Sequence, residues 1–124
     1  MGVSVRTEGN VAIVELLGEF TLGKSGVSRP LDLHGHRLED LGQTLRGLVE
    51  RGFTRIVLDL DGVRFLDSAG LGELVAWKKR TTQLGGDLRL LRPHDRVREV
   101  LELTTLMRVF QVFDAEADAV ASFR

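Results

Sequence analysis

The stretch that decides the fold of this chain is residues 55–74, RIVLDLDGVRFLDSAGLGEL. The apolar residues within 56–60 form a short run with β-branched side chains, which predicts a buried strand of a parallel sheet. Asp67 and Ser68 follow, and their side-chain oxygens can accept hydrogen bonds from the free backbone amides of a first helical turn. The stretch therefore predicts a strand, a short polar turn and the start of a helix.

Two glycines, Gly70 and Gly72, come directly after this helix start. A glycine destabilises a helix by about 0.8–1 kcal/mol relative to alanine, so two in one turn indicate a special use. They leave the backbone around the Ser68 hydroxyl without side-chain cover. We name residues 65–72, FLDSAGLG, the elbow, and we expect it to be the functional centre of the chain.

The segments on both sides of the elbow alternate between strand and helix patterns. The expected elements, in chain order, are strands at 3–6 and 11–17, a helix at about 36–51, a strand at 56–60, a helix from the elbow to about 84, a strand at 88–91, a helix from 93–95 onward, an edge strand at 109–113 and a final helix to 123 capped by Asp114. In the second helix, Val75 and Leu84 are expected on the buried face. This order predicts an α/β fold: a mixed, mainly parallel sheet of four to five strands with an N-terminal antiparallel hairpin and about four helices.

Composition limits the classes of function. The chain has 124 residues and a net charge of −1, which predicts a single domain, 1–124, without the basic surface that nucleic acids require. Cysteine is absent, which excludes disulfides, thiol catalysis and thiolate metal sites. The sequence shows neither an apolar run near 18 residues nor a signal peptide, so we expect a cytoplasmic protein without a membrane partner. No cofactor is expected, and the oligomeric state stays open.

Residues 18–25, GEFTLGKS, match the letter pattern of a phosphate-binding P-loop and follow a predicted strand. The nucleotide-binding candidates in this segment are Gly18, Gly23, Lys24 and Ser25. Asp59 or Asp61, at the end of a hydrophobic strand, would then hold magnesium. The mechanism requires a helix that begins at 24–25, but Pro30 would interrupt it. A nucleotide-binding protein is therefore an alternative to a function at the elbow.

The sequence does not favour a hydrolase site at the elbow or a metal site at the histidines. A hydrolase nucleophile elbow requires a glycine two places before the serine, and Leu66 stands there. His34 and His36 lack an identified set of carboxylate ligands, so no metal site is expected. A purely structural role remains open, in which Asp67 or Ser68 only caps the helix.

Residues 53–113 resemble a STAS domain of the bacterial anti-sigma factor antagonist type. The resemblance rests on the strand at 56–60, the D-S-A-G-L-G sequence at 67–72, the Gly-Gly-Asp turn at 85–87, the Arg-Pro helix start at 92–93 and the short strand at 109–113. It implies that an anti-sigma factor with kinase activity phosphorylates Ser68. It also implies that the unphosphorylated antagonist binds this partner and frees a sigma factor, and that phosphorylation ends the binding.

The resemblance also implies a partner-binding surface. Its residues are Asp67, Ser68, Ala69, Gly70, Leu71, Gly72 and Thr21. Two features depart from the family: Thr21 stands where short antagonists usually carry an acidic or amide residue, and the loop at about 22–35 is longer than the usual connection. A second possibility within the same fold is a scaffold subunit of a larger signalling assembly.

Overall fold

The computed structural model describes residues 2–17, 20–22, 38–66 and 68–124. Its elements, in chain order, are β1 (Gly2–Glu8), β2 (Val11–Leu17), β3 (Phe20–Leu22), α1 (Leu38–Glu50), β4 (Arg55–Asp59), β5 (Val63–Leu66), α2 (Ser68–Gln83), β6 (Asp87–Leu91), α3 (Asp95–Leu103), the 3₁₀ helix η1 (Leu106–Arg108), β7 (Val112–Phe113) and α4 (Glu116–Ala121). The predicted α/β class is confirmed. None of the described helices is long and apolar enough to cross a bilayer.

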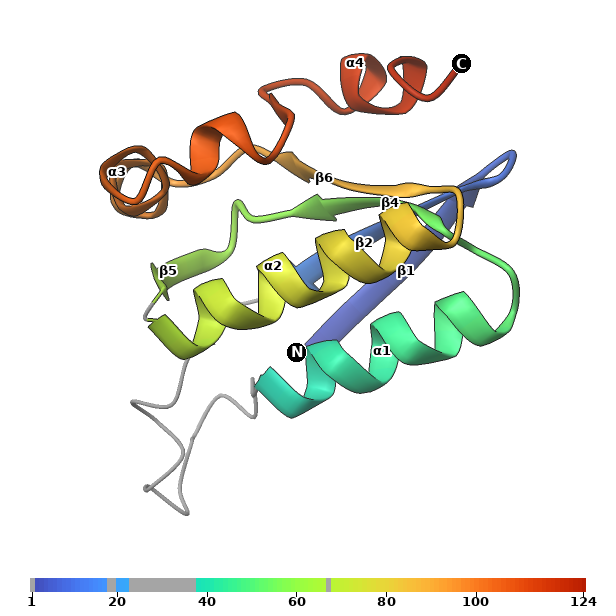
Figure 1. Ribbon diagram of the computed structural model, residues 1–124, viewed down its shortest axis with the longest axis horizontal. Helices are drawn as coiled ribbons and strands as arrows, with labels where there is room; N and C mark the ends of the chain where they lie inside the picture. Colours follow the sequence, from blue (N-terminus) through green and yellow to red (C-terminus); the bar gives the residue numbers. More distant parts are fainter. Residues whose placement is uncertain (1, 18–19, 23–37, 67) are drawn as a thin grey trace.

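The main sheet has five strands in the order β1-β2-β4-β6-β7. Figure 1 labels the first four of these strands, which lie side by side. β1 and β2 form the predicted antiparallel hairpin, and the other neighbouring strands are parallel. Because β4 and β6 run in the same direction, their carboxyl ends meet at one edge of the sheet. The segments that follow them, β5 and α3, contact each other at that edge.

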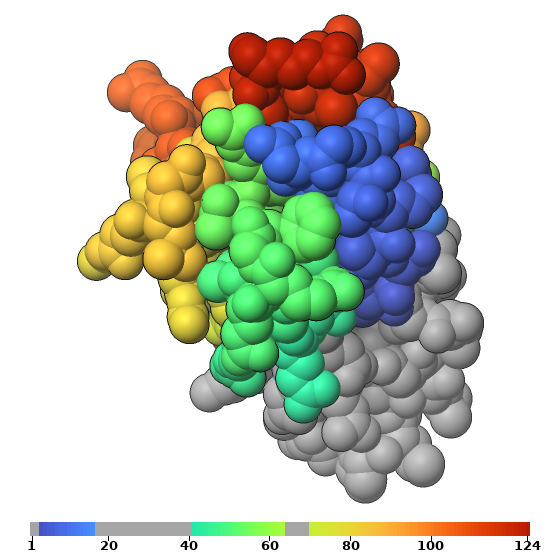
Figure 2. All heavy atoms as spheres, turned by 90° about the vertical axis from the view of Figure 1, so that its right-hand side faces the viewer, coloured from blue at the N-terminus to red at the C-terminus, as the bar shows by residue number. Residues whose placement is uncertain are grey.

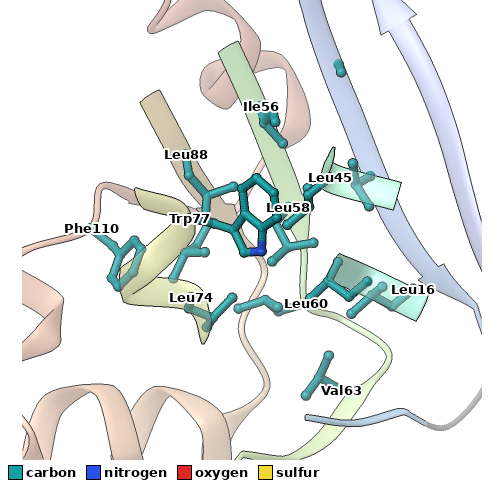
Figure 3. Packing of buried hydrophobic residues seen from close by; sticks show 14 of the residues in the cluster. Leu16, Leu45, Ile56, Leu58, Leu60, Val63, Leu74, Trp77, Leu88 and Phe110 are labelled. Carbon is teal, nitrogen blue, oxygen red and sulfur yellow. The ribbon is translucent and has the colours of Figure 1, made fainter. Parts of the chain in front are cut away.

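The two faces of the sheet bury different helices. Alternate β2 residues point to opposite faces, as a strand requires: Val14 lies in the main core, and Ile13 packs in a smaller cluster with α4. The main core holds the apolar faces of α1, α2 and α3. Figure 3 shows Trp77 of α2 at its centre, among leucines of β4 and β6, with only 5% of its surface exposed. The Trp77 Nε1–H donates to Glu73 Oε1 at 3.1 Å, which satisfies the polar atom of the buried ring.

The structure contains a second, two-stranded sheet that the sequence did not predict. β3 pairs with β5 in parallel, so a turn and a short strand separate β4 from the elbow. Strands of three and four residues carry too few side chains for a two-residue periodicity to stand out. The expected direct passage from strand to elbow was therefore wrong.

Three smaller expectations were also wrong. Val75 is 36% exposed, because the buried face of α2 is the narrower one that carries Leu74 and Trp77. Leu84 is 50% exposed and lies in the turn that follows the last residue of α2, Gln83. The strand expected at 109–113 is limited to β7, since Val109 still has the helical backbone of the η1 cap and only the last two residues pair with β6. Asp114 is not the cap of α4: its Oδ1 accepts a hydrogen bond from Arg98 Nη2 at 2.9 Å, and the residue at the cap position is Ala115.

Candidate functional site

The elbow lies at the edge of the sheet where the parallel strands end. β5 ends at Leu66 and α2 begins at Ser68, so the predicted helix start at this residue is confirmed. Asp67 lies outside the described residues. A helix N-terminus presents free backbone N–H groups and the positive end of the helix dipole, which favours a negatively charged group. The Ser68 position is therefore compatible with a phosphate.

The glycines of the elbow have different environments. Gly72 is exposed, and a Cβ atom placed on it would meet no atom within 4 Å. Gly70 is buried, and Leu71 is half-buried and packs against the main core. Among residues 70–72, the helix backbone is thus left uncovered at Gly72, one turn after Ser68.

Gly72→Ala is expected to stabilise the folded protein by about 0.5–1 kcal/mol. The position is helical, exposed and free of steric neighbours, so alanine gains helix propensity without a clash. Thermal unfolding should show a melting temperature a few degrees above that of the wild type. A lower melting temperature would mean that Gly72 has a packing role that the structure does not show.

The structure places Thr21 beside the elbow. Thr21 of β3 is the register partner of Phe65 in β5, and Leu22 is the partner of Leu66, the last residue of that strand. β3 also contacts α2. Pairing of β3 with β5 thus brings two predicted parts of the partner surface together, although more than 40 residues separate them in the sequence.

The alternative site at 18–25 finds little support in the described residues. Gly18, Gly23, Lys24 and Ser25 lie outside them, as do His34 and His36 and most of the loop at 22–35. The middle of the segment, β3, is a strand paired with β5. A phosphate-binding loop instead curls its successive N–H groups around the phosphate. Within the described part of the chain, no group of three or more potential ligands is placed to hold a metal ion.

An ion pair near the elbow, between a buried aspartate and a half-exposed arginine, was not predicted. Asp59, at the end of β4, is 1% exposed, and its Oδ2 accepts a hydrogen bond from Arg92 Nη2 at 2.6 Å. This hydrogen bond raises the pKa of the Arg92 guanidinium above its ordinary value. Asp59 is therefore engaged by a cation of the protein itself, and its proposed alternative role as a magnesium ligand loses support.

Arg92 has an unusual backbone. Its φ is +50°, in the left-handed region, which for a residue other than glycine costs about 1–2 kcal/mol. Its N–H donates to the Phe113 carbonyl at 2.8 Å, so the strained residue is held between β7 and the carboxylate of Asp59. In the sequence, Asp59 stands at the end of a buried strand and Arg92 begins the Arg-Pro helix start, but no pattern connects the two residues.

Comparison with known proteins identifies relatives of this chain. The model of the STAS domain family matches residues 3–119. BtrV of Bordetella bronchiseptica, which is named as an anti-sigma factor antagonist, is 36% identical over 88 residues, covering 69% of this chain and 74% of BtrV. The match confirms the resemblance seen in the sequence.

Solved structures with the same fold include other proteins described as anti-sigma factor antagonists. The crystal structure of one from Thermotoga maritima has a TM-score of 0.76 at 23% identity, covering 98% of this chain and 94% of that one. SpoIIAA in its unphosphorylated form has a TM-score of 0.70 at 21% identity, covering 96% of this chain and 93% of SpoIIAA. The structure of SpoIIAA in its phosphorylated form has a TM-score of 0.69 at 18% identity, with 99% and 100% covered.

Proposed function

Because the chain belongs to the STAS domain family, we propose that it is an anti-sigma factor antagonist switched by phosphorylation of Ser68. In this proposal the unphosphorylated protein binds an anti-sigma factor with serine kinase activity, and a sigma factor is released. The place of action is the cytoplasm, and the protein acts by binding rather than by catalysing a reaction. The names of its relatives support the antagonist role.

The observation that carries the proposal is the position of the elbow. Ser68 is the first residue of α2, and Gly72 leaves the surface one turn later open for a partner. β3 adds Thr21 to the same end of the molecule. A partner that packs against this surface would lie directly over the serine backbone.

Phosphorylation at this position would affect the folded protein and the complex differently. A phosphoserine adds about −1.5 to −2 charges and three acceptor oxygens. The helix N-terminus favours this charge by about 0.3–1 kcal/mol, so the fold is expected to tolerate it. A closely packed partner would have to desolvate a dianion beside Asp67, which opposes binding. This difference makes Ser68 suitable as a switch.

The test is phosphate transfer in a purified mixture. Incubated with ATP and each candidate anti-sigma factor kinase of the source organism, the protein should gain one phosphate by intact mass, and Ser68→Ala should gain none. Ser122→Ala is the matched control, because it removes a serine hydroxyl far from the elbow in the sequence. Ser122 Oγ accepts a hydrogen bond from Arg89 and donates one to the Ala119 carbonyl. The Ser122→Ala protein should still gain one phosphate. A phosphate that persists in Ser68→Ala would show that the serine is assigned wrongly.

A further inference from the structure

We propose that the ion pair between Asp59 and Arg92 positions the elbow by fixing the turn from which β5 leads to Ser68. Its importance for signalling rests on the proposed function, but the position itself is a property of this chain. Asp59 and Arg92 are positioning residues here: the pair acts on the serine through the backbone.

The two carboxylate oxygens of Asp59 bind two different segments. Oδ1 accepts the backbone N–H of Asp61 at 3.0 Å, within the turn between β4 and β5. Oδ2 accepts Arg92 Nη2 at 2.6 Å, in the connection between β6 and α3. The Leu60 N–H donates to the Leu91 carbonyl at 2.8 Å beside them. The buried side chain of Asp59 thus connects the turn before β5 to the segment before α3.

Arg92 combines two energetically unfavourable features. Arg92 holds a left-handed backbone, and its Nε is buried without a hydrogen-bond partner in the described structure. Such features persist where the surroundings enforce them, and they concentrate at sites where position matters. If position 92 only had to turn the chain into α3, a glycine could adopt the left-handed backbone there without strain.

The effect of the pair is expected to be local. Leu60 and Val63, on either side of the turn, are fully buried in the main core and will hold the overall fold without the pair. What the pair adds is a fixed relation between the turn, α3 and β5, since α3 packs against β5. When it is lost, β5 and the first turns of α2 should open more often, while the rest of the sheet is unaffected.

The experiment is amide hydrogen exchange followed by NMR on the double variant Asp59→Asn/Arg92→Ala. Removing both charges avoids an uncompensated buried ion, and asparagine keeps an oxygen for the Asp61 N–H. We expect amides of β5 and of the first two turns of α2 to exchange roughly tenfold faster, and amides of α1 and β2 to keep wild-type rates. The control is Asp87→Asn, which weakens a buried cluster with Lys78 and Arg89 at the other end of β6.

Three outcomes would overturn the proposal. Wild-type exchange in β5 would show that the pair does not hold the turn, and uniformly faster exchange or an unfolded double variant would show that it supports the whole fold instead. Equal opening of β5 in Asp87→Asn would show that the elbow responds to any loss of charge pairing. If no kinase modifies wild-type Ser68, the proposed function fails, and the exchange result still decides the role of the pair.

Discussion

Ser68→Asp is expected to weaken binding to the anti-sigma factor by about 100-fold or more, while the melting temperature changes by only about 1–2 °C. The carboxylate lies at the N-terminus of α2, where the helix dipole favours a negative charge. In the complex the same charge would be taken out of water beside Asp67, and a loss of about 2.7 kcal/mol already corresponds to 100-fold. Calorimetric titration of the purified partner, with thermal unfolding of the free protein, measures both quantities.

The matched control for this variant is Ser68→Asn, which has nearly the size of aspartate without its charge and is also accepted at a helix start. If charge is the cause, Asn should retain most of the affinity. If Asn and Asp weaken binding equally, the partner surface excludes any larger side chain, and the electrostatic account of the switch is wrong. A large loss of stability in either variant would instead indicate a structural serine.

The sequence predicted those parts of the fold that long periodic patterns encode. Leu41, Leu45 and Leu48 recur at helical spacing and are fully buried in α1, and the hairpin and the central strand follow equally clear patterns. The helix start at Ser68 was predicted from side-chain chemistry at a single position, and the structure places it there. Thr21 was assigned to the partner surface from the family resemblance, and the pairing of β3 with β5 explains how it reaches the elbow.

What the sequence did not predict depends on contacts between distant segments. β3 and β5 are too short to give a pattern of their own, and each is a strand because it pairs with the other. Asp59 and Arg92 lie 33 positions apart, so their ion pair follows only from the parallel pairing of β4 and β6. Gly70 and Gly72 looked equivalent in sequence, and only packing distinguishes the buried glycine from the exposed one.

Gly86→Ala is expected to destabilise the protein by about 3 kcal/mol and to lower the melting temperature by roughly 10 °C. A Cβ atom at this position would lie 1.9 Å from the carbonyl oxygen of Thr54 and 2.3 Å from its carbonyl carbon. Both are backbone atoms, so no side chain can rotate away. The same Thr54 carbonyl accepts the Asp87 N–H at 2.9 Å, so relief of the clash would break the hydrogen bond that begins the pairing of β4 with β6.

Substitutions of two other glycines distinguish a steric clash from backbone strain as the cause of the lost stability. Gly85 has a φ of +89°, and a Cβ atom added to it would meet no atom within 4 Å, so Gly85→Ala tests backbone strain alone and should destabilise by about 1 kcal/mol. Gly72→Ala meets neither obstacle and should stabilise. The order of melting temperatures should therefore be Gly72→Ala above wild type, then Gly85→Ala, then Gly86→Ala. A Gly86→Ala protein as stable as Gly85→Ala would contradict the close approach to Thr54.

The location of the clash also predicts what Gly86→Ala should leave unchanged. Thr54 and Gly86 precede β4 and β6, at the end of the molecule seen in Figure 2, where the connection into β4 lies between the hairpin and the end of α2. The elbow follows the carboxyl end of β4, at the opposite edge of the sheet. Below its melting temperature the variant should therefore bind the partner and accept phosphate like the wild type. Lost binding in the folded variant would show that the two edges of the sheet are coupled, and stability and switching could then no longer be treated as separate properties of this domain.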